Sequence, residues 1–295
     1  MNEKRRQVVL RDVKHVFMVE GSGDGRVLQH TLRHFCDEMF HFVIHWDLKS
    51  DLPDFSAYKN VTLIPRQRVY WGTDSQVLVE NQLFRAARNR FREAKWYHLI
   101  SESDVPLMSS DYFDDFYNQK LVSDIEFDGH KDKYKSRIQF YMPIRRLKIR
   151  NSKSGLFMHR AVKAVNMLCK INRLKKLGKP VYKGSNWVSL TKADMEKVLS
   201  FNDFGHFLNS SLADEVYVQT ILGDSHLDVV NPKREVTDER YLALSSRYVD
   251  WKRGNPYQFN ESDVAELIGL KNSTYTFARK VKSEGIARSV IAELN

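Results

Sequence analysis

The chain has little cysteine, little proline and no long apolar run, and each shortage narrows the class of protein. Its 295 residues include two cysteines, Cys36 and Cys169, too few for a disulfide framework and more typical of a reducing compartment. The 7 prolines and 13 glycines form no linker, so one domain is expected. The segment after Met1 lacks the apolar stretch of a signal peptide or membrane anchor. We therefore expect a cytoplasmic protein.

Acidic residues are outnumbered, which predicts an anionic partner. The chain has 47 Lys and Arg against 37 Asp and Glu, a net charge of +10. Basic clusters lie at 145–150 and 170–179. The second has apolar residues between the basic ones, as an amphipathic helix on an anionic membrane would, with Arg173, Lys175 and Lys176 toward the lipid. A solvated face is the alternative, and the lack of interleaved aromatics argues against nucleic acid.

Apolar runs alternate with amphipathic stretches over the first hundred residues. This order predicts a single α/β domain built on a mostly parallel sheet with helices on both faces. Ligands bind such sheets at the carboxyl ends of the strands, where Glu20, Asp47 and the segment 101–104 fall. Strands are expected at 16–19, 42–46, 61–64 and 97–101, and helices at 26–39 and at 75–94, the latter capped by Ser75.

The glycine-rich segment 21–25 and the ten histidines do not define a site by themselves. The segment 21–25 has neither dinucleotide-binding nor P-loop spacing, so a strand-to-helix turn close to the ligand is expected. The histidines do not pair four residues apart or join a cysteine cluster, which gives a zinc site little support.

The segment 210–222 places a carboxylate at the expected start of a partly buried helix. Ser211 is the candidate N-cap, Asp214 follows three residues later, and apolar residues from Val218 onward supply a buried face. Glu215 falls in the first turn, where free N–H groups and the helix dipole favour an ionised carboxylate. Such a group works as a general base. The alternative is that Asp214 and Glu215 only decorate a helix start.

Five short motifs, taken together in chain order, resemble the core-2/I-branching glycosyltransferase family, which includes the peptide O-xylosyltransferases. The resemblance covers nearly the whole chain and implies a glycosyltransferase A-type fold, with a nucleotide-binding half at about 1–120 and an acceptor-binding, catalytic half at about 121–295. Animal members are anchored and cysteine-rich, so we expect a bacterial member. The motifs are His45-Trp-Asp-Leu-Lys-Ser50, Tyr97-His-Leu-Ile-Ser-Glu-Ser-Asp-Val-Pro-Leu107, Lys183-Gly-Ser-Asn-Trp-Val-Ser-Leu190, Ala213-Asp-Glu215 and Phe277-Ala-Arg-Lys280.

The resemblance implies donor-binding roles for four residues. Asp47 would contact the nucleoside, and a carboxylate at a strand end suits a ribose or uracil. Tyr70 falls near the family's uracil-stacking tyrosine, with core packing as the alternative. Arg279 and Lys280 would neutralise the diphosphate, because this family works without a metal.

Two features of the donor region leave alternatives open. Glu102 and Asp104 have the spacing of a Mg or Mn site in other enzymes of this fold, although the resemblance implies no metal or other cofactor. Segment 256–259 lacks the second diphosphate-binding arginine of the animal enzymes, for which Arg279 or Arg253 is the candidate substitute.

Acceptor recognition is assigned to four side chains. Trp187 and Trp251 are candidates for stacking on sugar rings, with core packing as the alternative. Asp128 and Arg137 lie about where the family positions polar acceptor-binding residues.

These observations predict an inverting glycosyltransferase. It would transfer a sugar, N-acetylglucosamine first among the candidates, from a UDP-sugar to a hydroxyl of a glycan or lipid-linked oligosaccharide in bacterial surface polysaccharide synthesis. Glu215 would be the general base. The alternatives are UDP-xylose or UDP-galactose as donor, and a basic glycan-binding module without activity. The enzyme would be cytoplasmic, with an anionic membrane as a further partner and peripheral association with its inner face.

Overall fold

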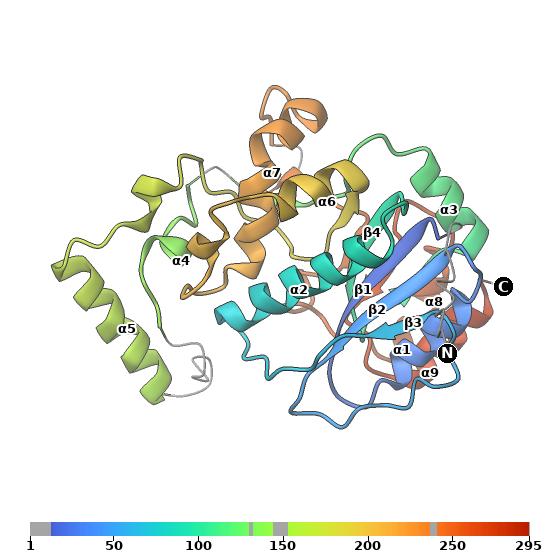
Figure 1. Cartoon of the computed structure of the whole chain (residues 1–295). Coiled ribbons are helices and arrows are strands. Elements are labelled where there is room, and N and C mark those ends of the chain that lie inside the picture. Colours follow the sequence, from blue (N-terminus) through green and yellow to red (C-terminus); the bar gives the residue numbers. More distant parts are fainter. Residues whose placement is uncertain (1–12, 130–131, 144–152, 237–240, 295) are drawn as a thin grey trace, which may run out of the picture.

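A computed structural model describes residues 13–129, 132–143, 153–236 and 241–294. Its centre is a five-stranded sheet in the order β3-β2-β1-β4-β7 (Figure 1). Four strands run parallel, and β7 pairs with β4 in the antiparallel sense. The expected α/β architecture is confirmed, consistent with a glycosyltransferase A-type fold. The strands are β1 (His15–Gly21), β2 (Phe40–Trp46), β3 (Val61–Leu63), β4 (Trp96–Ser101) and β7 (Ser189–Thr191).

Alternating side chains of the central strands supply two hydrophobic cores. In β1, Val16 and Met18 belong to one buried cluster, whereas Phe17 and Val19 belong to the other. Such two-sided burial is typical of parallel strands covered by helices on both faces. Each fully buried side chain of this size contributes roughly 1.5–3 kcal/mol, so both faces hold the sheet in place.

Helices cover both faces of the central sheet. The bounds of the first two helices in the chain differ from the predicted ones. The first core includes side chains of α2 (Asp74–Arg90), α6 (Lys192–Leu199) and α7 (Asp214–Val230). The second includes side chains of α1 (Arg26–His34) and α3 (Ser110–Asn118), and α9 (Glu284–Ala292) packs against α1.

Tertiary context explains the shifted helix bounds. Helix α1 ends before residue 39 because Phe35 leaves helical geometry and enters the core, after which the chain turns into β2. Helix α2 is capped by Thr73, whose hydroxyl accepts a hydrogen bond from the Ser75 N–H, so the predicted Ser75 cap is wrong by two residues. It ends at Arg90, short of Ala94.

Two small sheets fold the second half of the chain against the first. One has the order β5-β10-β9, from β5 (Val105–Pro106), β10 (Phe277–Arg279) and β9 (Arg247–Val249). The other pairs β6 (Phe127–Asp128) with β8 (Tyr241–Ala243). The remaining elements are α4 (Ser136–Gln139), α5 (Lys153–Leu168), α8 (Val264–Ile268) and the short 3₁₀ helices η1 (Arg173–Lys176), η2 (Phe204–Phe207) and η3 (Glu261–Asp263).

The basic tract at 170–179 is not the amphipathic helix that its spacing predicts. It contains the single 3₁₀ turn η1. The Arg173 guanidinium donates hydrogen bonds to the carbonyls of Leu208 and Asn209, and Leu177 is buried. Arg173 therefore faces the protein. Lys170 and Gly178 adopt left-handed conformations, with φ of 54° and 65°, which interrupt a helix across this tract. The other basic cluster, 145–150, lies outside the described residues.

None of the helices in the described ranges is long and apolar enough to cross a bilayer.

The close approach of β1 to β2 at the carboxyl edge predicts that Gly21 is intolerant of a side chain. A Cβ at Gly21 would lie 2.1 Å from Cε3 of Trp46. Gly21→Ala should lower the free energy of unfolding by about 1–3 kcal/mol, the usual cost of overpacking, as measured by urea denaturation. Gly205→Ala is the control, because a Cβ there meets nothing within 4 Å. Equal stability of the two variants would contradict this packing.

Candidate active site

Two adjoining cavities lie at the carboxyl edge of the main sheet. The strand-end cavity, of about 190 Å³, is lined by residues that follow β1, β2 and β4, including Asp47 and Glu102. The helix-end cavity, of about 480 Å³, is lined by the first turn of α7, including Asp214 and Glu215. The two are continuous, because both are lined by Trp71, Trp187, Arg279 and Lys280.

Glu215 lies in the first turn of α7, as expected, and two cations fix its carboxylate. Oε2 accepts a hydrogen bond from Arg137 Nη1 at 2.6 Å and lies 3.7 Å from Lys183 Nζ. The Glu215 side chain keeps 31% of its surface exposed. Glu215 is therefore an oriented carboxylate at a cavity wall, and not only a decoration of the helix start.

The start of α7 differs from the predicted cap. Ala213 is the N-cap, and no side chain caps the helix. Leu212 adopts a left-handed conformation with φ of 53°, and its N–H donates to the Gly72 carbonyl. This turn directs Ser211 toward Gly72, where its hydroxyl lies 3.5 Å from the carbonyl oxygen. The predicted Ser211 cap is therefore wrong, although the position of Glu215 in the first turn is unaffected.

Lys183 links two of the predicted site residues. Its Nζ lies 2.6 Å from Asp128 Oδ2, and Tyr134 donates a hydrogen bond to the same oxygen. The N–H of Gly184 donates to the backbone carbonyl of Glu215, which joins this segment to α7. Asp128 is not among the described residues that line the helix-end cavity, so its visible action is to hold Lys183 beside Glu215.

The two tryptophans assigned to sugar stacking both line the helix-end cavity. Trp187 lies between the two cavities, and Trp251 is 38% exposed at the far side of the helix-end cavity. A third cavity, of about 340 Å³, adjoins this side and shares Trp251 and Glu126 with it. Exposed tryptophan at a cavity wall suits the C–H faces of a sugar.

Of the two side chains predicted to bind the nucleoside, Asp47 lines the strand-end cavity and Tyr70 does not. Asp47 Oδ1 accepts a hydrogen bond from the Lys49 N–H, and Lys49 Nζ lies 3.2 Å from Oδ2. The same Nζ lies 4.9 Å from the centre of the Tyr70 ring. The side chain of Trp71, 49% exposed, lines both cavities, whereas Tyr70 lines neither.

Arg279 and Lys280 are brought to the strand ends by β-pairing. Ala278 of β10 pairs with Val105 of β5, and the N–H of Val281 donates to the Ser103 carbonyl. The Arg279 guanidinium is buried and lies 3.9 Å from the centre of the Trp187 ring. Burial lowers the pKa of Arg279, and burial together with the charge of Arg279 lowers that of Lys280. An anion bound between the cavities would relieve both effects.

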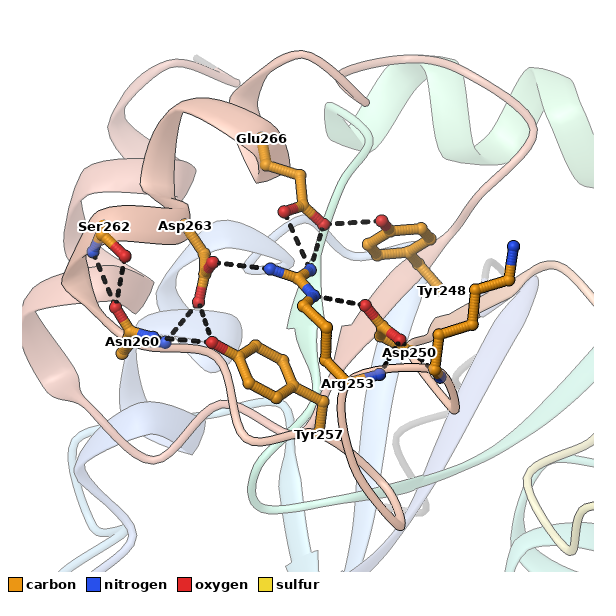
Figure 2. Close-up of polar contacts among 9 residues, drawn as sticks. Tyr248, Asp250, Arg253, Tyr257, Asn260, Ser262, Asp263 and Glu266 are labelled. Atoms are coloured by element: carbon orange, nitrogen blue, oxygen red, sulfur yellow. Dashed lines mark hydrogen bonds and ion pairs between the residues drawn. The ribbon is translucent and has the colours of Figure 1, made fainter.

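Arg253 is engaged elsewhere. Figure 2 shows its guanidinium surrounded by the carboxylates of Asp250, Asp263 and Glu266. It also lies 4.3 Å from the centre of the Tyr257 ring. It lines neither cavity. Of the two candidates for the absent second arginine, Arg279 is therefore the one that lines the cavities.

Glu102 and Asp104 lie in different surroundings. Asp104 is fully buried, its Oδ2 accepts a hydrogen bond from the Ser101 N–H, and its Oδ1 lies 3.5 Å from Arg279 Nε. Glu102 lines the strand-end cavity near Lys280. Within the described residues, no group of three His, Cys, Asp or Glu side chains is placed to hold a metal ion.

Comparison with known proteins decides the family. The model of the core-2/I-branching enzymes matches residues 16–270, most of the chain. The chain belongs to this family. No curated protein matches the chain. Membership makes the protein a glycosyltransferase, which uses a nucleotide-sugar donor and a glycan acceptor.

In this branching-enzyme family member, several contributors to the two cavities were not predicted from the sequence. Lys183 lies in a motif that carries the family resemblance, so its position was visible but its role was not. Glu126, an acid between the apolar Ile125 and Phe127, lines two cavities, and burial raises its pKa to about 7. Trp71 was distinguishable from Tyr70 only through the structure.

Buried carboxyl groups support the cavity floor of this glycosyltransferase. Burial and the charge of Asp214 raise the pKa of Glu20 to about 8. Burial and the charge of Glu215 raise the pKa of Asp214 to about 7. One oxygen of each, Glu20 Oε1 and Asp214 Oδ1, is buried without a hydrogen-bond partner. The folded protein thus holds protons that the unfolded chain releases at lower pH.

These raised pKa values predict a loss of stability in mild alkali. Their stabilising contribution is complete below the unfolded pKa near 4 and is lost as pH rises through the folded values. Between about pH 7 and about pH 8.5, above the ordinary histidine range, the free energy of unfolding should fall by on the order of 1 kcal/mol. Glu20→Gln should flatten this slope in urea titrations. Glu284→Gln, at the exposed start of α9, is the control, and equal slopes in both variants would refute the assignment.

Proposed function

We propose that the protein transfers N-acetylglucosamine from UDP-N-acetylglucosamine to a hydroxyl of a glycan or lipid-linked oligosaccharide, with inversion at the anomeric carbon. We place this reaction in bacterial surface polysaccharide synthesis. The observation that carries the proposal is the position of Glu215, whose carboxylate lines a cavity that has Arg279 and Lys280 on another part of its wall. A base and an anion-binding pair at the same cavity are what displacement of UDP by a hydroxyl requires.

Glu215 acts as the general base in this mechanism. Within the described chain both neighbouring cations contact Oε2, so Oε1 is left for the acceptor hydroxyl. The carboxylate takes the hydroxyl proton while the acceptor oxygen forms a bond to the anomeric carbon. The bond between that carbon and the UDP oxygen breaks at the same time, and the electron pair leaves with UDP. Arg137 and Lys183 hold the carboxylate in place throughout.

Arg279 and Lys280 stabilise the departing UDP. Charge accumulates on the diphosphate as the sugar leaves, and fixed cations in a cavity shielded from water stabilise it without reorganisation. Arg279 Nη1 has no hydrogen-bond partner within the described residues, although it is buried. A buried, unpaired guanidinium nitrogen is costly unless a ligand binds it. A diphosphate supplies that partner, so the proposal includes no metal.

Asp47 and Trp71 would bind the nucleoside. The Tyr70 ring would lie behind the Lys49 side chain. Trp187, Trp251 and Arg137 would contact the acceptor. The donor sugar is tested by measuring UDP release from UDP-N-acetylglucosamine, UDP-xylose and UDP-galactose in the presence of glycan acceptors. Faster release from either of the last two donors would reassign the sugar and leave the mechanism intact.

Replacing the base tests the chemical step. Glu215→Gln should keep the fold and UDP affinity but lower turnover by about a hundredfold or more, because the amide does not accept the proton. UDP release and UDP titration calorimetry measure the two quantities. Glu284→Gln, a first-turn glutamate of α9 outside both cavities, is the matched control. Turnover of Glu215→Gln within a few-fold of the parent would remove Glu215 from this role.

Metal removal tests the leaving-group proposal. Saturating EDTA should leave the parent enzyme active, whereas Lys280→Ala should weaken UDP binding and slow transfer by about tenfold or more. Lys282→Ala, an exposed lysine outside both cavities, should behave as the parent. Loss of activity in EDTA that Mn or Mg restores would instead assign Glu102 and Asp104 to a metal.

A further inference from the structure

Helix α5 is attached to the protein along one narrow face. Figure 1 shows it at the edge of the molecule, beyond α4 and remote from the central sheet. Gly155 and Asn166 are its buried residues, and Val162 packs against Phe140 and Met142. Asn166 also hydrogen-bonds the backbone of Tyr141, which fixes the C-terminal half of the helix.

The opposite face of α5 is apolar. Gly155, Val162 and Asn166 occupy the attached face at spacings of seven and four residues. Phe157, Ala164 and Leu168 repeat this spacing two residues later, and two residues rotate the helix surface by about 200°. Phe157 is 73% exposed and Leu168 is 82% exposed. Further exposed apolar residues flank them: Leu156, Met158, Val165 and Met167.

The charge around α5 has one sign. Between Asp132 and Asp194 the chain has 17 Lys and Arg and no Asp or Glu. Because the whole chain has 47 basic and 37 acidic residues, the remainder has 30 basic against 37 acidic, a net charge of −7. The positive charge of the protein is thus concentrated in the segment that contains α5. Lys153 and Arg160 are exposed on the helix itself.

We propose that the outer face of α5, formed by Phe157, Ala164 and Leu168, docks on an anionic lipid bilayer. An amphipathic helix with exposed large apolar side chains and basic residues beside them binds such a surface by burying the former among the acyl chains and pairing the latter with headgroups. The proposal is independent of the transferase reaction.

Vesicle sedimentation tests the proposal with the full chain. The parent should pellet at about 50 mM salt with phosphatidylcholine vesicles that contain about 30% phosphatidylglycerol, bind pure phosphatidylcholine weakly, and dissociate in about 500 mM salt. Phe157→Ser with Leu168→Ser should lower vesicle affinity at least about tenfold. Leu121→Ser is the matched control, because Leu121 is 92% exposed and far from α5 in the chain. Circular dichroism checks folding.

A second pair of variants separates charge from apolar insertion. Lys153→Gln with Arg160→Gln should weaken binding about tenfold or more, since each basic side chain contributes roughly fivefold. The charge-matched control is Lys59→Gln with Lys233→Gln, both exposed residues outside this segment. Absence of parent binding to the anionic vesicles, or unchanged binding of either α5 double variant, would overturn the proposal. Light scattering provides the last test: a parent dimer that Phe157→Ser with Leu168→Ser dissociates would make this face a contact between copies and would also overturn it.

Discussion

The pairing of β10 with β5 decides where the cations of the active site lie. Ala278 pairs with Val105, and the chain that follows β10 hydrogen-bonds the loop after β4. This brings Arg279 and Lys280, near the C-terminal end, to the carboxyl edge of a sheet built from the first hundred residues. Without this pairing the strand-end cavity would have carboxylates from β1, β2 and β4 and no opposing charge from β10. The arrangement places an anion-binding pair where parallel sheets bind ligands.

The site contains two groups of charged side chains, which differ in how fully neighbouring ion pairs neutralise them. Glu215 is paired with Arg137 and Lys183, so its position is fixed by the protein. Among the described residues, the Arg279 guanidinium forms an ion pair with Asp104 at 3.5 Å and contacts the Trp187 ring, and its Nη1 is buried without a hydrogen bond. Under the proposed mechanism the base is therefore organised before substrate binds, whereas the diphosphate site would be completed by its ligand. Burial raises the pKa of Glu20 to about 8, so at neutral pH this carboxyl group is mostly uncharged and does not offset the cations.

The central sheet was predictable because local pattern and tertiary environment agree there. The strands at 16–19, 42–46, 61–64 and 97–101 were placed within two residues, since continuous apolar runs suit strands buried on both faces. The tract at 170–179 was not, because Lys170 and Gly178 adopt left-handed conformations that its basic and apolar spacing does not reveal. In the site, too, features set by the local sequence were predictable, whereas those set by long-range contacts were not. Glu215 was visible from its helix start, but Lys183, 32 positions earlier, meets it only through the fold.

The cavity walls and helix α5 are held in place by different kinds of contact. The residues around the cavities depend on long-range pairings, such as Gly184 with Glu215 and Val281 with Ser103, so the site is rigid wherever backbone joins distant segments. Helix α5 depends instead on local contacts with residues 140–142. A change in its outer face therefore leaves the cavities unaltered, because the long-range pairings that shape them do not pass through α5.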